Sequence, residues 1–171
     1  EGASADITGL IGQYAHGNEP SHHTTYLYAY AGQQWKTAEK VREICTTMYT
    51  DQPDGLCGNE DCGQMSAWYV LSSMGFYPVN PSNGAYVFGS PVFDEAEIEL
   101  SGEKTFKIVA QNNSPENIYI QSATLNGDAY TKSFITHDTL LEGGVLTFQM
   151  GPEPNPEFGK NPDNRPKSTV Y

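Results

Sequence analysis

The stretch DGLCGNEDCGQMSAWYVLSSMGFYPVNP, residues 54–81, decides the fold, because a helical pattern and a strand pattern meet inside it. Residues 63–74 carry apolar side chains at helical spacing and are followed by Gly75, which predicts a helix that ends there. The run of Pro and Asn residues from Pro78 to Gly84 then interrupts regular structure. We therefore expect helices before residue 80 and strands after it.

Three more helical segments are expected upstream. Residues 21–31 follow Pro20 and end at a glycine, and residues 36–49 place their apolar side chains on one stripe. A shorter helix at residues 6–14 is weakened by two glycines. The aromatic side chains of this part need more facing surface than about 80 residues supply. Residues 1–80 are therefore expected to be part of a larger helical body.

The remainder of the chain reads as a β region with a Pro-rich tail. Residues 81–151 alternate short apolar segments with turn residues, which is typical of an antiparallel sheet, and Asn126-Gly127 is the clearest hairpin signal. The prolines of residues 152–171 exclude regular structure, so this tail is expected to wrap over a surface or to be disordered. The expected fold class is α+β, with strands at 85–89, 95–100, 104–111, 118–125, 133–136 and 145–150.

Composition narrows the possible partners. The chain has 21 Asp and Glu against 9 Lys and Arg, which argues against nucleic acid or an anionic membrane surface as a partner. It lacks the long apolar run of roughly 18 residues that a membrane-spanning helix requires. Its three cysteines are odd in number and exclude a complete disulfide framework, and Cys57 and Cys62 lack the second cysteine pair of a structural zinc site.

The first candidate site is HGNEPSHH, residues 16–23. Asn18 and Glu19 offer the oxygen ligands that Ca²⁺ prefers, and His22 and His23 stand at an expected helix start, where polar ligands bind. Adjacent histidines point about 100° apart on a helix, so the two do not suit one metal. The alternative is that Glu19 only complements the helix dipole and that the histidines are ordinary core or surface residues.

The second candidate site lies just before the helix at 63–74. In an extended stretch Asn59 and Asp61 would face the same space and could hold and activate one water, while Glu60 would face the other side. The alternative is structural, because Asp61 with Gln64 forms an N-capping pair. Neither candidate contains a nucleophile elbow, a phosphate loop or a paired Cys and His, which argues against esterases, kinases and cysteine proteases.

Three segments together resemble the C-terminal third of glycoside hydrolase family 92: HGNEPSHH with YLYAYAGQQWKT (26–37), the stretch 54–81, and MGPEPN (150–155). The resemblance covers essentially residues 5–160. It implies an inverting, exo-acting α-mannosidase that uses Ca²⁺ to grip the terminal mannose, built from an N-terminal β-sandwich and an (α/α)6 barrel. Residues 1–80 would be the last helices of that barrel, and residues 81–171 the closing β region.

The same resemblance assigns roles to residues. Asp61 matches the family's general base, and Asn59 stands where many members place a first Asp, so Asp61 would act beside an amide. Asn18 and Glu19 match the loop near the calcium and the terminal sugar, and which of them touches the metal is left open. The expected substrate-binding residues are Glu19, His22, His23 and Gln64. The general acid, a glutamate, would lie upstream of Glu1, so the isolated chain is expected to be inactive.

The resemblance also suggests the biological setting. The expected partners are mannose-containing glycans and the missing N-terminal part of the same protein, and the favoured linkage is α-1,2. A periplasmic or secreted location is expected, and a lipid anchor is compatible with it. The alternative from another class is a non-catalytic glycan-binding or structural module, in which the Tyr-rich helix and the β region bind glycans without hydrolysis.

Overall fold

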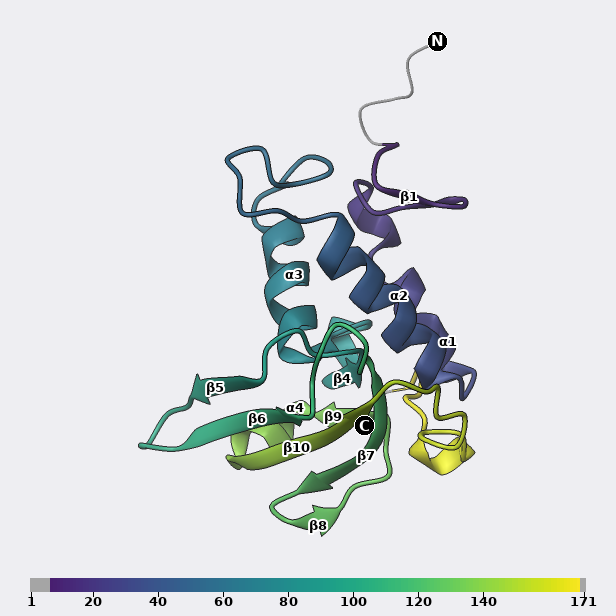
Figure 1. The fold of residues 1–171 in the computed structure, drawn as a ribbon. Coiled ribbons are helices and arrows are strands. Elements are labelled where there is room, and N and C mark those ends of the chain that lie inside the picture. Colours follow the sequence, from purple (N-terminus) through teal and green to yellow (C-terminus); the bar gives the residue numbers. More distant parts are fainter. Residues whose placement is uncertain (1–6, 170–171) are drawn as a thin grey trace.

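A helical half stands on a strand half, as Figure 1 shows in the computed structural model, which describes residues 7–169. The main helices are α2 (Gln34–Thr47) and α3 (Gln64–Met74), and the strands from β3 onward follow α3 in the chain. The expected α+β class is confirmed. Among residues 7–169 no helix has the length and apolarity that crossing a bilayer requires.

The helices α2 and α3 lie close to the predicted segments. The predicted stripe on α2 is confirmed, because Val41, Ile44 and Cys45 are buried. Helix α3 ends at Gly75, whose φ of 115° is left-handed and whose amide donates to the carbonyls of the last helical turn. Only glycine takes that conformation without strain, so Gly75 ends the helix as expected.

The predicted helix at 21–31 is wrong as a continuous element. The chain forms two 3-10 turns, η1 (Glu19–Ser21) and η2 (Thr24–Tyr26), and then the single turn α1 (Leu27–Tyr30). In a continuous α-helix the backbone N–H of Tyr26 would donate to the carbonyl of His22. Here it donates to the carbonyl of His23, and the carbonyl of His22 accepts from the indole N–H of Trp68 at 3.1 Å. A tertiary hydrogen bond therefore takes the place of a helical one.

The predicted helix at 6–14 is also wrong. Asp6 lies outside the described residues, and the rest forms a hairpin in which β1 (Leu10–Ile11) pairs with β2 (Tyr14–Ala15). Gly12 has a φ of 61°, which suits the turn between the two strands and not a right-handed helix.

The larger sheet has five strands in the order β5-β6-β10-β7-β8. The expectation of an antiparallel sheet is wrong for one pair, because β10 is parallel to β6. Strand β10 lies between β6 and β7, which run in opposite directions, so it must be parallel to one of them. The strands are β5 (Glu95–Glu99), β6 (Thr105–Gln111), β7 (Tyr119–Leu125), β8 (Asp128–Ala129) and β10 (Gly144–Gly151).

The predicted hairpin between β7 and β8 is confirmed. Asn126 and Gly127 form its turn with φ angles of 53° and 89°, as a two-residue hairpin requires. A second, antiparallel sheet of three strands has the order β3-β4-β9 and contains the unpredicted strand β3. Its strands are β3 (Phe76–Tyr77), β4 (Ala85–Phe88) and β9 (Phe134–Thr136), and the short helix α4 (His137–Leu141) follows β9.

Two buried side chains of α2 join the helices to the strands. Gln34 donates to the carbonyls of Phe88 at 3.1 Å and Gly89 at 2.8 Å, just at the end of β4. The guanidinium of Arg42 is also buried and donates to polar groups that follow the strands: Ser90 Oγ, the Pro91 and Ser114 carbonyls and Asn113 Oδ1. These hydrogen bonds satisfy the buried charge of Arg42 with neutral acceptors.

The Pro-rich tail wraps over the strands, which is the first of the two arrangements that the sequence allowed. Phe158 is buried in the core of the sheets, and the Asn155 amide donates to the Gln121 carbonyl at 2.8 Å. The amide of Ser133 donates to Asn164 at 2.8 Å, near the short turn η4 (Pro162–Asn164). Figure 1 shows this tail lying near α1.

Candidate active site

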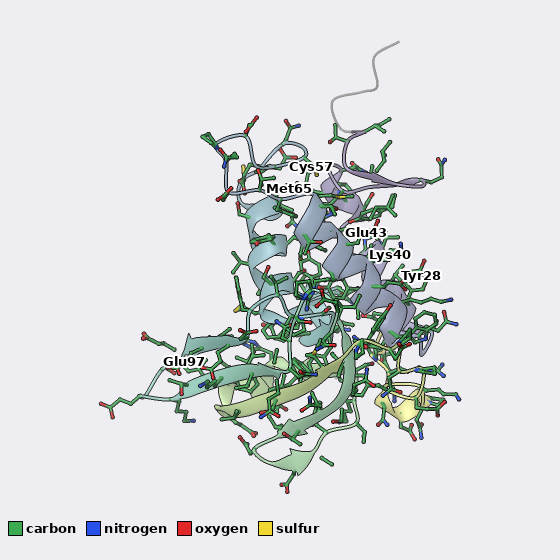
Figure 2. The ribbon with its side chains drawn as sticks, viewed as in Figure 1. Tyr28, Lys40, Glu43, Cys57, Met65 and Glu97 are labelled. Atoms are coloured by element: carbon green, nitrogen blue, oxygen red, sulfur yellow. The ribbon has the colours of Figure 1, made fainter. Side chains whose placement is uncertain are left out.

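The two loops singled out by sequence meet at the end of α3 that lies away from the sheets (Figure 1). Figure 2 labels Cys57 and Met65 at this end. The backbones touch there, since a Cβ placed on Gly58 would lie 2.6 Å from the Cα of Gly17. A Cβ on Gly17 would lie 3.3 Å from the Cys57 carbonyl oxygen. Glycine at both positions is what allows the loops to approach so closely.

His16 lies at the centre of this contact and is fully buried. Its Nδ1 is 2.7 Å from the hydroxyl of Tyr14, and its Nε2 is 2.6 Å from the hydroxyl of Tyr49. The Tyr49 hydroxyl donates its hydrogen to the Met65 carbonyl at 3.1 Å. Its oxygen must therefore accept from His16 Nε2–H, and His16 Nδ1 accepts from Tyr14. The result is a directed chain of hydrogen bonds from the hairpin to α3.

His22 makes a second set of links between the same parts. Its Nε2 donates to the His16 carbonyl at 2.9 Å, and its Nδ1 lies 3.0 Å from the side-chain nitrogen of Gln64. Its backbone carbonyl is the acceptor for Trp68 described above. The rings of His16 and His22 stack with centroids 4.5 Å apart, and the rings of His16 and Trp68 meet edge to face at the same centroid distance. The 16–23 loop is thus joined to the first turns of α3 by side chains and backbone.

Burial keeps both histidines neutral. Desolvation, together with the smaller effect of the neighbouring His22, lowers the pKa of His16 to about 3. Burial also lowers the pKa of His22, although the bond to the His16 carbonyl acts in the opposite direction. A proton on either ring would meet a stacked imidazole in a site with little water, so the charged form is disfavoured.

Asn18 and Glu19 both carry side-chain oxygens that could bind a cation. The Asn18 amide nitrogen donates to Ser21 Oγ at 3.1 Å, which leaves its oxygen to face away from that bond. Glu19 Oε1 is buried and has no hydrogen-bond partner in residues 7–169. A buried carboxylate oxygen without a partner is costly, and a hard cation would satisfy it. The donor set therefore fits Ca²⁺, although the described residues hold no group of three His, Cys, Asp or Glu side chains that could bind a metal alone.

The turn before α3 differs from the expected extended stretch. Asp61 and Cys62 have φ angles of 50° and 57°, which are left-handed, so the alternation that placed Asn59 and Asp61 on one side fails at Asp61. Both Asn59 and Asp61 are exposed. The conformation turns the chain sharply just before α3 and leaves the Asp61 carboxylate at the surface of the loop contact.

The structural alternative for Asp61, an N-cap of the helix, is wrong, because Glu60 caps the helix. The Glu60 carboxylate accepts from the amides of Gly63 and Ser66, the latter at 3.2 Å, and no side-chain cap is made at the N-cap residue Gly63. Hydrogen bonds from Ser66 and then Gly63 hold the pKa of Glu60 below its usual range. Since Glu60 serves the helix, the Asp61 carboxylate is not needed for capping.

The structure brings some of the predicted site residues together. Gln64 and His22 are in direct contact, whereas His23 is exposed. Both ring nitrogens of His22 are engaged within the chain. Sequence reasoning missed Tyr14, Tyr49 and Tyr77, which hold His16 and Gln64 from other elements. No local pattern marks these tyrosines, because their role depends on the folded contacts.

Comparison with known proteins identifies the family. Residues 1–152 match the glycosyl hydrolase family 92 catalytic domain. The chain belongs to glycosyl hydrolase family 92. A relative from Arthroderma benhamiae, described as an uncharacterized secreted glycosidase, is 37% identical over 140 residues, which are 80% of this chain and 18% of that protein.

Solved structures of family 92 enzymes share the fold. The α-mannosidase BT3965 of Bacteroides thetaiotaomicron, in complex with mannoimidazole, is 43% identical with a TM-score of 0.91 over 95% of this chain and 21% of that one. The inverting mannosidase BT2199 of the same species is 45% identical with a TM-score of 0.87 over 92% of this chain and 21% of that one. The chain therefore spans about a fifth of the length of these relatives.

The buried histidines predict a loss of stability at acidic pH. Below pH 6.5 the unfolded chain protonates His16, whereas the folded chain takes up that proton only near pH 3. Stability should therefore fall as the pH drops through this window, by about 1.4 kcal/mol per pH unit for this histidine. His16→Gln removes the titrating group and should flatten the dependence, even though the variant is less stable. Chemical unfolding at a series of pH values measures both slopes.

His23→Gln is the matched control, because His23 belongs to the same loop and is exposed. The free energy of unfolding of His23→Gln should change with pH at the same rate as that of the wild type. Equal slopes for His16→Gln and the wild type would show that His16 is not held neutral by burial.

Proposed function

We propose that this chain supplies the general base and part of the calcium and sugar site of an inverting, calcium-dependent exo-α-mannosidase. The observation that carries the proposal is the joining of the Asn18–Glu19 loop to the Asp61 turn through His16, His22 and the start of α3. Family membership and the mannoimidazole complex of a relative support mannose as the sugar. The general acid would come from residues upstream of this chain, so the chain alone is expected to be inactive.

Asp61 is the proposed general base. Its carboxylate is exposed. Because Glu60 caps α3 instead, the Asp61 carboxylate is free to take a proton from a water molecule. In an inverting reaction that water attacks the sugar from the face opposite the leaving group, while an acid protonates the glycosidic oxygen. The amide of Asn59, two residues earlier, is proposed to help hold the water.

Asn18 and Glu19 are the proposed calcium residues. The unpartnered Glu19 oxygen and the Asn18 amide oxygen supply two of the six to eight oxygen ligands that Ca²⁺ takes, so the upstream part of the domain must supply others. When bound, the ion would polarise and position the sugar hydroxyls that it contacts. His23 is a further proposed sugar contact, since it is exposed to solvent.

The substrate and location rest on relatives and on the family resemblance. A relative is named as a secreted glycosidase, which supports a secreted enzyme. A periplasmic or lipid-anchored form is proposed alongside it. The proposed substrates are glycans with terminal α-mannose, with α-1,2 linkage favoured by the resemblance. Hydrolysis of α-1,2-, α-1,3- and α-1,6-linked mannobioses side by side decides the linkage.

Asp61→Asn should remove most of the activity in the whole protein that carries this chain. An amide cannot accept the proton, so kcat on an aryl α-mannoside should fall by roughly 10²- to 10⁴-fold with little change in calcium affinity. Asp54→Asn is the control, because it removes an exposed carboxylate from the same loop. Undiminished turnover by Asp61→Asn would favour the non-catalytic module.

Glu19→Gln should weaken calcium binding while the fold is kept. The substitution replaces a charged oxygen by a neutral one of the same shape, so the calcium concentration that gives half-maximal activity should rise by about tenfold or more. Calorimetric titration of calcium into the variant provides a measure independent of turnover. Unchanged calcium affinity would mean that the 16–23 loop has only the structural role of starting the η1 turn.

A further inference from the structure

The side-chain amide of Gln64 uses only one of its two ends within the chain. Its nitrogen donates to His22 Nδ1 at 3.0 Å and to the Tyr77 hydroxyl at 2.9 Å. Its oxygen has no hydrogen-bond partner in residues 7–169 and is not among the buried unpartnered atoms. Both hydrogens of the amide are therefore committed, and the acceptor end is left open.

The ring of His22 fixes which end of Gln64 is open. The His22 Nε2 must carry a hydrogen, because its partner is the backbone carbonyl of His16, which can only accept. In the neutral ring Nδ1 then has no hydrogen and accepts from a donor. If the Gln64 amide were reversed, its oxygen would face the lone pair of Nδ1, and two acceptors would repel each other. The tautomer of His22 thus sets the orientation of the amide.

Two further contacts hold this orientation. Tyr77 lies on β3 and stacks on Tyr26 with ring centroids 5.4 Å apart, so the second acceptor for Gln64 is itself fixed by packing. His22 is 2% exposed, its ring stacks on His16, and its backbone carbonyl accepts from Trp68. The amide is therefore preorganised before any ligand arrives, which lowers the entropy lost on binding.

Gln64 is hydrogen-bonded to both loops that carry the groups proposed to act on the sugar. Its backbone N–H donates to the Asp61 backbone carbonyl at 3.3 Å, and its side chain contacts His22, three residues after Glu19. We propose that Gln64 Oε1 is a fixed acceptor for one hydroxyl of the bound mannoside, and that His22 is the positioning residue that aims it. The inference rests on the proposed function, because it names a contact of the same sugar site.

The roles separate in a double-mutant cycle on kcat/KM in the whole protein. Gln64→Leu removes the acceptor and should lower kcat/KM by about tenfold, as expected for one hydrogen bond to a sugar hydroxyl. His22→Gln keeps a donor for the His16 carbonyl but loses the acceptor at Nδ1, so it should cause a similar loss. The double variant should lose no more than Gln64→Leu alone. Additive losses would overturn the positioning role of His22.

The hydroxyl is identified with monodeoxy mannosides. For one of them the wild type and Gln64→Leu should have equal kcat/KM, since the partner of the amide is missing from the substrate. A tenfold effect of Gln64→Leu that persists with every deoxy sugar would overturn the proposed contact.

A spectroscopic test does not depend on turnover. With ¹⁵N-labelled histidine, the His22 ring in the wild type should show a hydrogen on Nε2 and none on Nδ1 at neutral pH. Gln64→Glu places a carboxylate against Nδ1 and should bring a proton to it, while Gln149→Glu, at an exposed position on β10, should leave the His22 signals unchanged. A hydrogen on Nδ1 in the wild type would overturn the assignment of the amide. Absence of mannosidase activity in the wild type would defeat the proposed function instead, and the ring spectrum would still decide whether His22 aims Gln64.

Discussion

The site depends on one constraint, which is that the two buried histidines must make hydrogen bonds in their neutral form. A buried imidazole without hydrogen-bond partners costs free energy. Each ring nitrogen of His16 and His22 therefore has a hydrogen-bond partner in the segments that surround it. Those segments are the β1–β2 hairpin, the loop before η1, the segment after α2 that carries Tyr49, and the start of α3. Satisfying the rings therefore fixes the loop that carries Glu19 against the turn that carries Asp61.

Much of the fold could be predicted because local signals and tertiary contacts agree there. The apolar stripe of α2, the glycine end of α3 and the Asn126-Gly127 turn are encoded within a few residues. The errors occur where distant residues decide. Trp68 takes a carbonyl that a helix at 21–31 would need, and the insertion of β10 beside β6 makes one parallel pair. Neither contact leaves a trace in the local periodicity.

The candidate site was located by its residue types but not by its geometry. The motifs at 16–23 and 54–68 contain Glu19, Asp61 and Gln64, and the resemblance to family 92 attached roles to them. The sequence could not show that Glu60 takes the capping role or that Asp61 adopts a left-handed conformation. Nor could it show that His22 is sealed inside the loop contact, because its partner Gln64 lies 42 residues away.

A crystal structure of the whole protein with calcium and mannoimidazole would test the central claim most directly, namely that the two joined loops form one sugar site. We expect the sugar analogue to lie between the two loops, with Glu19 bound to the calcium ion. The Asp61 carboxylate should lie within about 3 Å of the water placed to attack, or of the analogue atom that stands in its place. An analogue bound away from either loop, or a calcium ion that does not contact the 16–23 loop, would contradict this claim.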